Sequence, residues 1–364
     1  MKKVLYISNE DRSLGGSSLS LAAMLDSLRG RVQPVILLRS HGAVEQFFTE
    51  RGYECVILPF MRGTFNHEGL SRAVRFLPHA LHRRLVQRRC IREAAGRFGD
   101  IDLVHSKSST VDIGLDIARA LGVAHVWHIR EYMDLGLGMH PFPSWQSWRE
   151  KLAASDAVVA ISRGLQKQIG PGCICLPDAV CRASDAVMYP EKEPYVLFLA
   201  GTLSEAKNPL EALRVFAGAG LGGHALKMVG NVDEPMRTSL EEAARSLSAR
   251  VQFLPFTNQV KPLISKASAL LVSSAYEGMG RVSVEAMFYG CPVVARNSGG
   301  SRDVLGEGRF GKLYETVEEG AEALRETVFR FPFEQVRRAR EEAVATYSLE
   351  CYGEKILSIY RPLW

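Results

Sequence analysis

Short runs of β-branched and other apolar residues alternate with helix-forming stretches along the whole chain. The runs in the first half are residues 3–8, 32–38, 53–59, 101–106, 124–129 and 157–162, and those in the second half are residues 195–201, 226–230, 251–256, 269–274 and 292–296. Strands that are separated by helices form parallel sheets with right-handed crossovers. Two such series predict an α/β fold with two doubly wound, Rossmann-like domains.

The length of 364 residues also suits two domains better than one. The segment 188–194, MYPEKEP, combines two prolines with three charges and is typical of a linker. We therefore expect one domain over 1–188 and a second over 189–347. Residues 348–360 form an amphipathic pattern that predicts a closing helix.

No apolar run is long enough to span a bilayer, and the amino terminus is typical of a first strand rather than of a signal peptide. Seven scattered cysteines favour reduced thiols and a cytoplasmic protein. Cys173 and Cys175, with Cys181, could form half of a metal site. Small buried thiols are the favoured interpretation, because no histidine or second cysteine pair lies nearby.

The net charge of +5 is concentrated in one place. Residues 72–97 contain eight arginines and one glutamate, so this stretch carries +7 and the rest of the chain about −2. We expect a basic amphipathic helix that begins near Pro78 and presents Leu77, Leu81 and Leu85 among the arginines. Such a helix can lie on anionic lipid, or it can simply pack on its own domain as a solvated helix.

The segment 277–300, EGMGRVSVEAMFYGCPVVARNSGG, is the most informative stretch for function. Glu277 and Glu285 bracket a glycine-rich turn that opens a short helix, and a strand and a Gly-Gly loop follow. Glycines at a helix start let backbone N–H groups approach a phosphate, and the helix dipole favours negative charge there. A carboxylate on each side can accept hydrogen bonds from a polyol. The arrangement suits a nucleotide-sugar.

This segment resembles the E-x7-E signature of glycosyltransferase family 4, whose members are retaining enzymes with the GT-B fold. The matching positions are Glu277, Gly278, Gly280, Glu285, Ala286, Met287, Gly290, Pro292, Val293, Val294, Gly299 and Gly300. The resemblance implies two Rossmann-like domains that face each other across a cleft, with the carboxyl-terminal helix crossing back to the first domain. Residues 1–188 plus 348–364 would then bind the acceptor, and residues 189–347 the nucleotide-sugar.

The resemblance also assigns roles to single residues. GTLSEAKNP resembles the family's G-R-L-x-x-x-K motif, so Lys207 would stabilise the leaving diphosphate. Thr202 stands where the family has arginine, and Arg281 is the predicted substitute; alternatively, Arg281 points to solvent or to a surface carboxylate. The predicted catalytic residues are His128, Lys207 and Glu277. The predicted donor-binding residues are Gly16, Thr202, Gly278, Met279, Gly280, Arg281 and Glu285.

The implied activity is that of a hexosyltransferase-type enzyme, which moves a sugar from a nucleotide-diphosphate sugar to an acceptor hydroxyl with retention and without a protein nucleophile. We expect no cofactor and no metal, because Asp100 and Asp102 lie at the amino end of their strand, the wrong end for a site. The expected acceptor is a glycan or a lipid-linked molecule of the cell envelope or an exopolysaccharide. The protein would be cytoplasmic, with the segment 72–97 as a possible contact to the inner membrane face.

Two other interpretations remain open at this stage. One is a sugar-nucleotide epimerase or a phosphorylase on the same architecture. The other is a non-catalytic basic protein that binds nucleic acid through the arginine stretch. The second is less favoured, because aromatic residues other than Phe76 do not alternate with the arginines.

Overall fold

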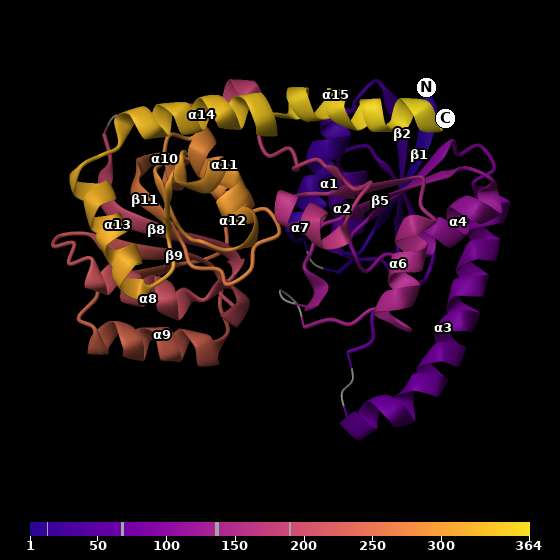
Figure 1. The fold of residues 1–364 in the computed structure, drawn as a ribbon, viewed down its shortest axis with the longest axis horizontal. Coiled ribbons are helices and arrows are strands. Elements are labelled where there is room, and N and C mark those ends of the chain that lie inside the picture. Colours follow the sequence, from indigo (N-terminus) through magenta and orange to yellow (C-terminus); the bar gives the residue numbers. More distant parts are fainter. Residues whose placement is uncertain (13, 67–68, 135–137, 189–190) are drawn as a thin grey trace. The chain divides into compact units, whose positions relative to one another are not determined.

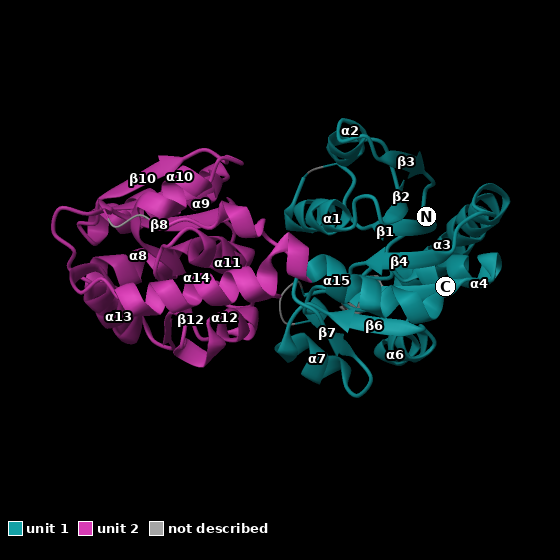
Figure 2. Cartoon of the chain, turned by 90° about the horizontal axis from the view of Figure 1, so that it is seen from above, with its two compact units in different colours: residues 1–178, 352–364 teal, residues 179–351 magenta. Residues whose placement is uncertain are grey.

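The computed structural model shows parallel strands that are separated by helices (Figure 1). It describes residues 1–364 except 13, 67–68, 135–137 and 189–190. The chain divides into two compact units, which are drawn in different colours in Figure 2. Unit 1 consists of residues 1–178 and 352–364, and unit 2 of residues 179–351. The predicted α/β fold with two Rossmann-like domains is confirmed.

Unit 1 is built on a parallel sheet with the strand order β3-β2-β1-β4-β5-β6-β7. Its strands are β1 (Lys2–Ser8), β2 (Val32–Leu38), β3 (Glu54–Ile57), β4 (Leu103–Lys107), β5 (Ala124–Ile129), β6 (Ala157–Ala160) and β7 (Ile174–Cys175). Its helices are α1 (Gly16–Ser27), α2 (Ala43–Thr49), α3 (Gly69–Arg97), α4 (Ile113–Leu121), α6 (Trp145–Ala153), α7 (Arg163–Ile169) and most of α15 (Leu349–Tyr360). The strand order reverses between β1 and β4, where such sheets open a crevice.

Unit 2 has a second parallel sheet with the order β10-β9-β8-β11-β12-β13. Its strands are β8 (Glu193–Thr202), β9 (Ala225–Asn231), β10 (Val251–Leu254), β11 (Ala267–Val272), β12 (Val293–Arg296) and β13 (Lys312–Tyr314). Its helices are α8 (Pro209–Gly218), α9 (Glu234–Ser246), α10 (Lys261–Lys266), α11 (Arg281–Phe288), α12 (Gly299–Val304), α13 (Val317–Phe329) and α14 (Phe333–Tyr347). The strand order again reverses in the middle, so the loops after β8 and β11 leave the same edge of the sheet side by side.

The division between the units lies before the predicted linker. Asp178 is the last residue of unit 1 on this side, and residues 179–188 already pack with unit 2. The backbone N–H of Val187 donates to the carbonyl of Phe288, and Lys192 Nζ donates to the carbonyls of Ser265 and Gly290 at 2.6 and 2.8 Å. The charged residues of the predicted linker therefore serve as anchors. Of the segment 188–194, residues 189–190 lie outside the described residues.

Helix α3 differs from the prediction at its start. It begins at Gly69, so Pro78 lies inside it rather than in its first turn. A proline inside a helix forfeits one backbone hydrogen bond, and the long flanking stretches on both sides continue the helix through it. Among the described residues no helix is long and apolar enough to cross a membrane.

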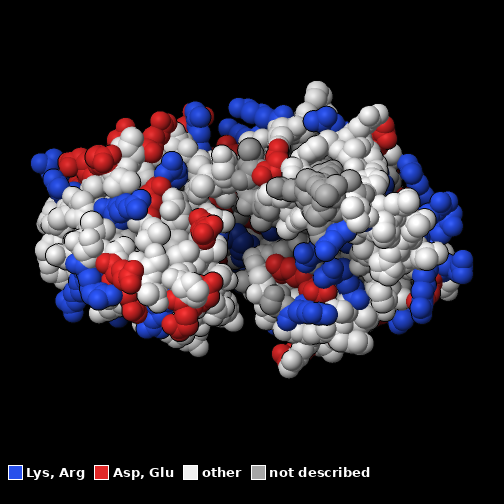
Figure 3. All heavy atoms as spheres, turned by 90° about the horizontal axis from the view of Figure 1, so that it is seen from below, with Lys and Arg blue, Asp and Glu red and all other residues white. Residues whose placement is uncertain are grey.

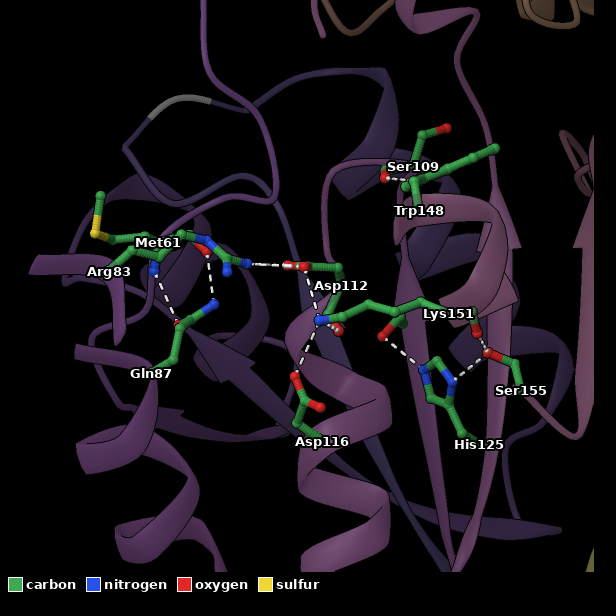
Figure 4. Close-up of polar contacts among 11 residues, drawn as sticks. Met61, Arg83, Gln87, Ser109, Asp112, Asp116, His125, Trp148, Lys151 and Ser155 are labelled. Carbon is green, nitrogen blue, oxygen red and sulfur yellow. Dashed lines mark hydrogen bonds and ion pairs between the residues drawn. The ribbon is translucent and has the colours of Figure 1, made fainter. Parts of the chain in front are cut away.

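Three wholly buried histidines lie on the central strands of unit 1. His125 faces α6, with its ring nitrogens 2.9 and 3.0 Å from the hydroxyls of Ser106 and Ser155 (Figure 4). His105 and His128 lie on the opposite face, where the hydroxyl of Tyr360 in α15 contacts His105. Burial lowers the pKa of His125 to about 3 and the pKa values of the other two well below 6.5.

These histidines predict an acid-sensitive fold. Because their pKa values are lower in the folded protein, the unfolded chain binds protons that the folded chain excludes once the pH falls below about 6.5. Stability should therefore be retained at neutral pH and decline below it, with a slope of up to about 4 kcal/mol per pH unit for three histidines. Thermal unfolding between neutral and mildly acidic pH measures this slope. His125→Gln should reduce it, whereas the same change at the exposed His41 should not; equal slopes for both variants would contradict this account.

Candidate functional site in the second unit

An ion pair joins two neighbouring loops at the carboxyl edge of the unit 2 sheet. Lys207 ends a short 3-10 turn after β8, and Glu277 lies in the loop after β11. Their Nζ and Oε1 atoms are 2.6 Å apart, and the lysine side chain is 37% exposed. Ser273 supports the arrangement by donating to the carbonyls of Lys207 and Asn208 at 3.1 and 2.7 Å. The topology thus brings together two residues that are 70 positions apart in the chain.

The Gly-Gly loop packs directly on the glycine-rich turn. The N–H of Gly300 donates to the carbonyl of Glu277 at 2.7 Å. A Cβ on Gly300 would lie 2.4 Å from Cα of Met279, and one on Gly299 would lie 2.5 Å from the carbonyl oxygen of Glu277. No larger residue fits without moving the backbone. This contact fixes the path of the chain into α11.

Two buried hydroxyl groups converge on the start of α11. Gly280 precedes the helix with a φ of 85°, and no side chain caps the helix. Ser283 and Ser301 are both 0% exposed, and their hydroxyls have no hydrogen-bond partner within the described residues. They lie 3.7 and 3.8 Å from where a Cβ of Gly280 would stand. Buried hydroxyls are normally paired, and a helix start attracts anions. Two unpartnered hydroxyls therefore stand beside a helix start, where negative charge is favoured.

Glu285 and Arg281 lie one turn apart on α11. Burial raises the pKa of Glu285, and Arg281 partly offsets this effect. Arg281 Nη1 donates to the carbonyl of Ala179 at 3.0 Å, so the backbone holds one end of its guanidinium. Its predicted role as a phosphate ligand stays a prediction, and the guanidinium has further N–H groups besides the one that donates to Ala179.

The other predicted donor residues of unit 2 differ in accessibility. Thr202 is exposed at the end of β8, where it pairs with Asn231 of β9. Gly278 is partly exposed, but Met279 is 3% exposed. Met279 therefore supports the loop through its packing, and only its backbone can take part in binding.

Gly16, a predicted donor-binding residue, lies at a helix start that a side chain of the same unit occupies. Gly16 is the first residue of α1, and the carboxylate of Glu10 accepts from the N–H groups of Gly15 and Ser18 at 3.2 and 2.7 Å and from the Ser18 hydroxyl. This helix start holds an internal carboxylate, and the predicted contact of Gly16 with the donor stays a prediction.

His128 belongs to a buried charged cluster in unit 1. The cluster includes Asp178, whose Oδ1 lies 2.5 Å from Arg130 Nη1 and 3.9 Å from Lys107 Nζ. Burial alone would raise the pKa of Asp178, but Arg130 and Lys107 hold it well below its usual value. His128 is 0% exposed, and burial and the neighbouring Lys107 lower its pKa. Its predicted catalytic role is untested, and the ring has no open surface here.

A hollow of about 610 Å³, including open solvent at its mouth, lies in unit 1 beside the end of β5. Its polar and aromatic lining residues are Glu131, Asp134, Trp145, Trp148, Arg149 and Gln168. Trp148 Nε1 donates to the carbonyl of Ser109 at 3.1 Å, and Glu131 accepts from the N–H of Ser109 at 2.9 Å. The lining is therefore held in place. The sequence reasoning missed this site, although two tryptophans three residues apart after β5 were a usable signal.

Asp100 and Asp102 both contact the first strand of unit 1. Asp102 pairs with Lys2 at 2.7 Å and accepts from the N–H of Lys3 at 2.8 Å, and Asp100 pairs with Lys3 Nζ at 2.9 Å. Both carboxylates thus bind β1. This is consistent with a turn at the amino end of β4.

Residues 184–331 match the family model described as Glycosyl transferases group 1. The matched residues lie within unit 2. The GalNAc-alpha-(1->4)-GalNAc-alpha-(1->3)-diNAcBac-PP-undecaprenol alpha-1,4-N-acetyl-D-galactosaminyltransferase of Campylobacter jejuni is 31% identical over 138 residues, which are 36% of this chain and 38% of that protein. The phosphatidyl-myo-inositol mannosyltransferase of Mycobacterium leprae is 29% identical over 236 residues, 58% of this chain and 60% of that protein. The matches span less than two thirds of either relative.

The crystal structure of Anabaena HepE in complex with UDP covers 100% of both chains with a TM-score of 0.78 and 18% sequence identity. At this identity the likeness concerns the fold alone. Together with the family match, it identifies the architecture as GT-B, as the resemblance in the sequence implied.

The two unpartnered hydroxyls give a sharp test of the phosphate site. The double variant Ser283→Ala with Ser301→Ala loses no hydrogen bond to any described residue, so its melting temperature should equal or exceed that of the wild type. Its affinity for nucleoside diphosphates should fall by about 1.5–3 kcal/mol, because hydrogen bonds to a charged ligand are lost. Calorimetric titration and thermal unfolding measure the two effects.

Ser273→Ala is the matched control. It removes two internal hydrogen bonds and should lower the melting temperature. Wild-type affinity in the double variant would show that no phosphate lies between these hydroxyls.

Proposed function

We propose that this protein transfers a glycosyl unit from a nucleotide-diphosphate sugar to an acceptor hydroxyl, with retention of the anomeric configuration. The observation that supports this most directly is the pair of buried, unpartnered hydroxyls of Ser283 and Ser301 at the uncapped start of α11. Lys207 and Glu277 lie at the same sheet edge, and the family match covers this unit. A diphosphate and a sugar polyol need this combination of donors and acceptors.

In the proposed reaction the bond between the anomeric carbon and the diphosphate oxygen breaks while the acceptor oxygen bonds to that carbon from the same face. The acceptor proton passes to a phosphate oxygen of the leaving group, so no protein nucleophile is needed. Lys207 and the first N–H groups of α11 stabilise the charge that develops on the diphosphate. Glu277 holds sugar hydroxyls, and Glu285 holds the ribose. No metal ion is required in this proposal.

We further propose that the transferred unit is a hexose and that the acceptor belongs to cell-envelope or exopolysaccharide synthesis, at the cytoplasmic side of the membrane. The names of the two curated relatives support this, since one acts on an undecaprenol-linked glycan and the other on phosphatidyl-myo-inositol. On this basis we propose that the acceptor is a glycan or a lipid-linked molecule. His128 would contact the donor only after a movement that exposes its ring.

Product analysis tests the proposed reaction. The protein is incubated with UDP-, GDP- and ADP-sugars, envelope lipid extract and a chelator, and the anomeric proton of the product is followed by NMR. We expect a product with the donor's anomeric configuration. Inversion would contradict retention, activity that returns only with magnesium or manganese would contradict metal independence, and epimerisation of the donor without acceptor would favour an epimerase.

The two glutamates should affect different steps. Glu285→Ala should weaken nucleotide-sugar binding by roughly 1.5–3 kcal/mol, because it removes hydrogen bonds to a charged acceptor group. Glu277→Ala should lower kcat more than affinity, since it contacts the transferred sugar. Glu326→Ala is the control, as Glu326 forms a similar pair with Lys312 at 3.0 Å on the surface of unit 2. Wild-type kinetics in both site variants would reject the proposed roles.

We propose that the hollow beside Trp145 receives a sugar ring of the acceptor. Aromatic faces combined with carboxylate, amide and guanidinium groups suit a polyol with apolar ring faces. Trp145→Ala should then raise the KM for the acceptor about tenfold or more, as expected when a contact of about 1.4 kcal/mol is lost. The thermal shift caused by the donor should stay unchanged. An unchanged acceptor KM would exclude this subsite.

A further inference from the structure

Helix α3 is fixed to unit 1 through one side. Arg83 Nη2 donates to both carboxylate oxygens of Asp112 at 2.7 and 2.8 Å, and Lys151 reaches the same carboxylate at 2.9 Å (Figure 4). Gln87 exchanges two hydrogen bonds with the backbone of Met61, at 3.1 and 3.3 Å. These contacts fix the rotation of α3 about its own axis relative to the rest of unit 1.

Apolar packing holds the same side of α3 along its length. Phe76 stacks with Phe65 and Phe142 at centroid distances of 5.9 and 5.1 Å. Further along, Cys90 and Ala94 are 2% and 0% exposed in the core. The spacing of these residues along the helix places them on a single face.

The opposite side of α3 carries large aliphatic side chains in solvent. Val74, Leu77, Leu81 and Leu85 are 69%, 65%, 56% and 68% exposed. They recur every three or four residues, so they form one continuous line on the helix. Because the other side is tied to the domain, α3 cannot turn them inward. A row of exposed aliphatic residues on a fixed helix marks an interaction surface.

Arginines continue this line and flank it. Arg88 and Arg92 follow Leu85 at the same helical spacing, Arg84 lies beside them, and all three are exposed. Arg89 is also exposed, and it forms an ion pair with Glu93 at 2.7 Å. In Figure 3 basic side chains gather on the right-hand side, where α3 lies in Figure 1. The α3 outer face, comprising Val74, Leu77, Leu81, Leu85, Arg88 and Arg92, is thus apolar at one end and cationic at the other.

We propose that the α3 outer face docks on an anionic phospholipid surface. The leucines would enter the boundary between head groups and acyl chains while the arginines contact lipid phosphates, as a basic amphipathic helix does at an interface. A second copy of this face would bring arginines either against arginines or against the aliphatic row, and neither arrangement supplies the anions that the arginines need. A nucleic acid would satisfy the arginines and leave the aliphatic row in water. The membrane is the partner that covers both parts.

Sedimentation with vesicles tests the proposal without donor or acceptor, so its failure is separate from that of the proposed transfer reaction. The wild type should bind vesicles with about 30 mol% phosphatidylglycerol at low salt, bind phosphatidylcholine vesicles far less, and be released in about 1 M salt. Replacing Arg84, Arg88 and Arg92 by Gln should weaken binding roughly hundredfold. Replacing Leu77, Leu81 and Leu85 by Gln should weaken it at least about tenfold.

Matched controls come from unit 2. Phe329→Gln with Phe333→Gln removes two side chains that are 65% and 50% exposed, and Arg214→Gln, Arg245→Gln and Arg338→Gln remove exposed arginines. Both control sets should bind as the wild type does. The proposal is overturned if the wild type binds neither vesicle, if the leucine variant binds unchanged, or if the leucines instead mediate a dimer by sedimentation velocity while vesicle binding is absent.

Discussion

The close contact between the Gly-Gly loop and the glycine-rich turn determines the geometry of unit 2's site. Gly299 and Gly300 approach the backbone of residues 277–279 more closely than any side chain would allow. This contact sets the position of Glu277 opposite Lys207 and directs Ser301 toward Gly280. A single backbone approach thereby brings a cation, a carboxylate, two hydroxyls and a helix start to one edge of the sheet. These groups match the chemistry of a diphosphate that carries a sugar.

The two units handle charge differently. In unit 1 the charges near the sheet edge are satisfied internally: Glu10 occupies the start of α1, and Asp178 neutralises part of the charge of Arg130 and Lys107. In unit 2 the start of α11 has no such internal anion among the described contacts, and two serines there lack partners. The difference indicates that unit 2 keeps its polar groups available for a ligand.

The sequence predicted most strands of both sheets well, because regularly spaced β-branched runs between helices leave few alternatives. It missed β13, whose three residues are too short to show a pattern. It placed the start of α3 at Pro78, because a proline is normally tolerated only in a first turn, whereas tertiary packing on both sides of Pro78 overrides this preference. The motif located Lys207 and Glu277, but the ion pair between them depends on the order of the strands.

The remaining site features could not be read from residue types alone. A serine inside a helix is an ordinary residue, so only the absence of a partner distinguishes Ser283 and Ser301. The contact of Arg281 with the carbonyl of Ala179 likewise depends on the tertiary fold, because the two residues lie far apart in the sequence. By contrast, the sequence did predict the exposed row on α3, because the spacing of Leu77, Leu81 and Leu85 is visible in it. Their exposure follows from the packing of the opposite face of the helix.

The central claim is that unit 2 binds a nucleotide diphosphate and its sugar. A thermal-shift series with UDP, GDP and ADP, their sugars, and the corresponding monophosphates tests it most directly, because a ligand that binds the native state raises the melting temperature. The account predicts that one diphosphate and its sugar raise the melting temperature of the wild type, that the monophosphate does so far less, and that the serine double variant loses the difference. No shift with any diphosphate or nucleotide-sugar would contradict it.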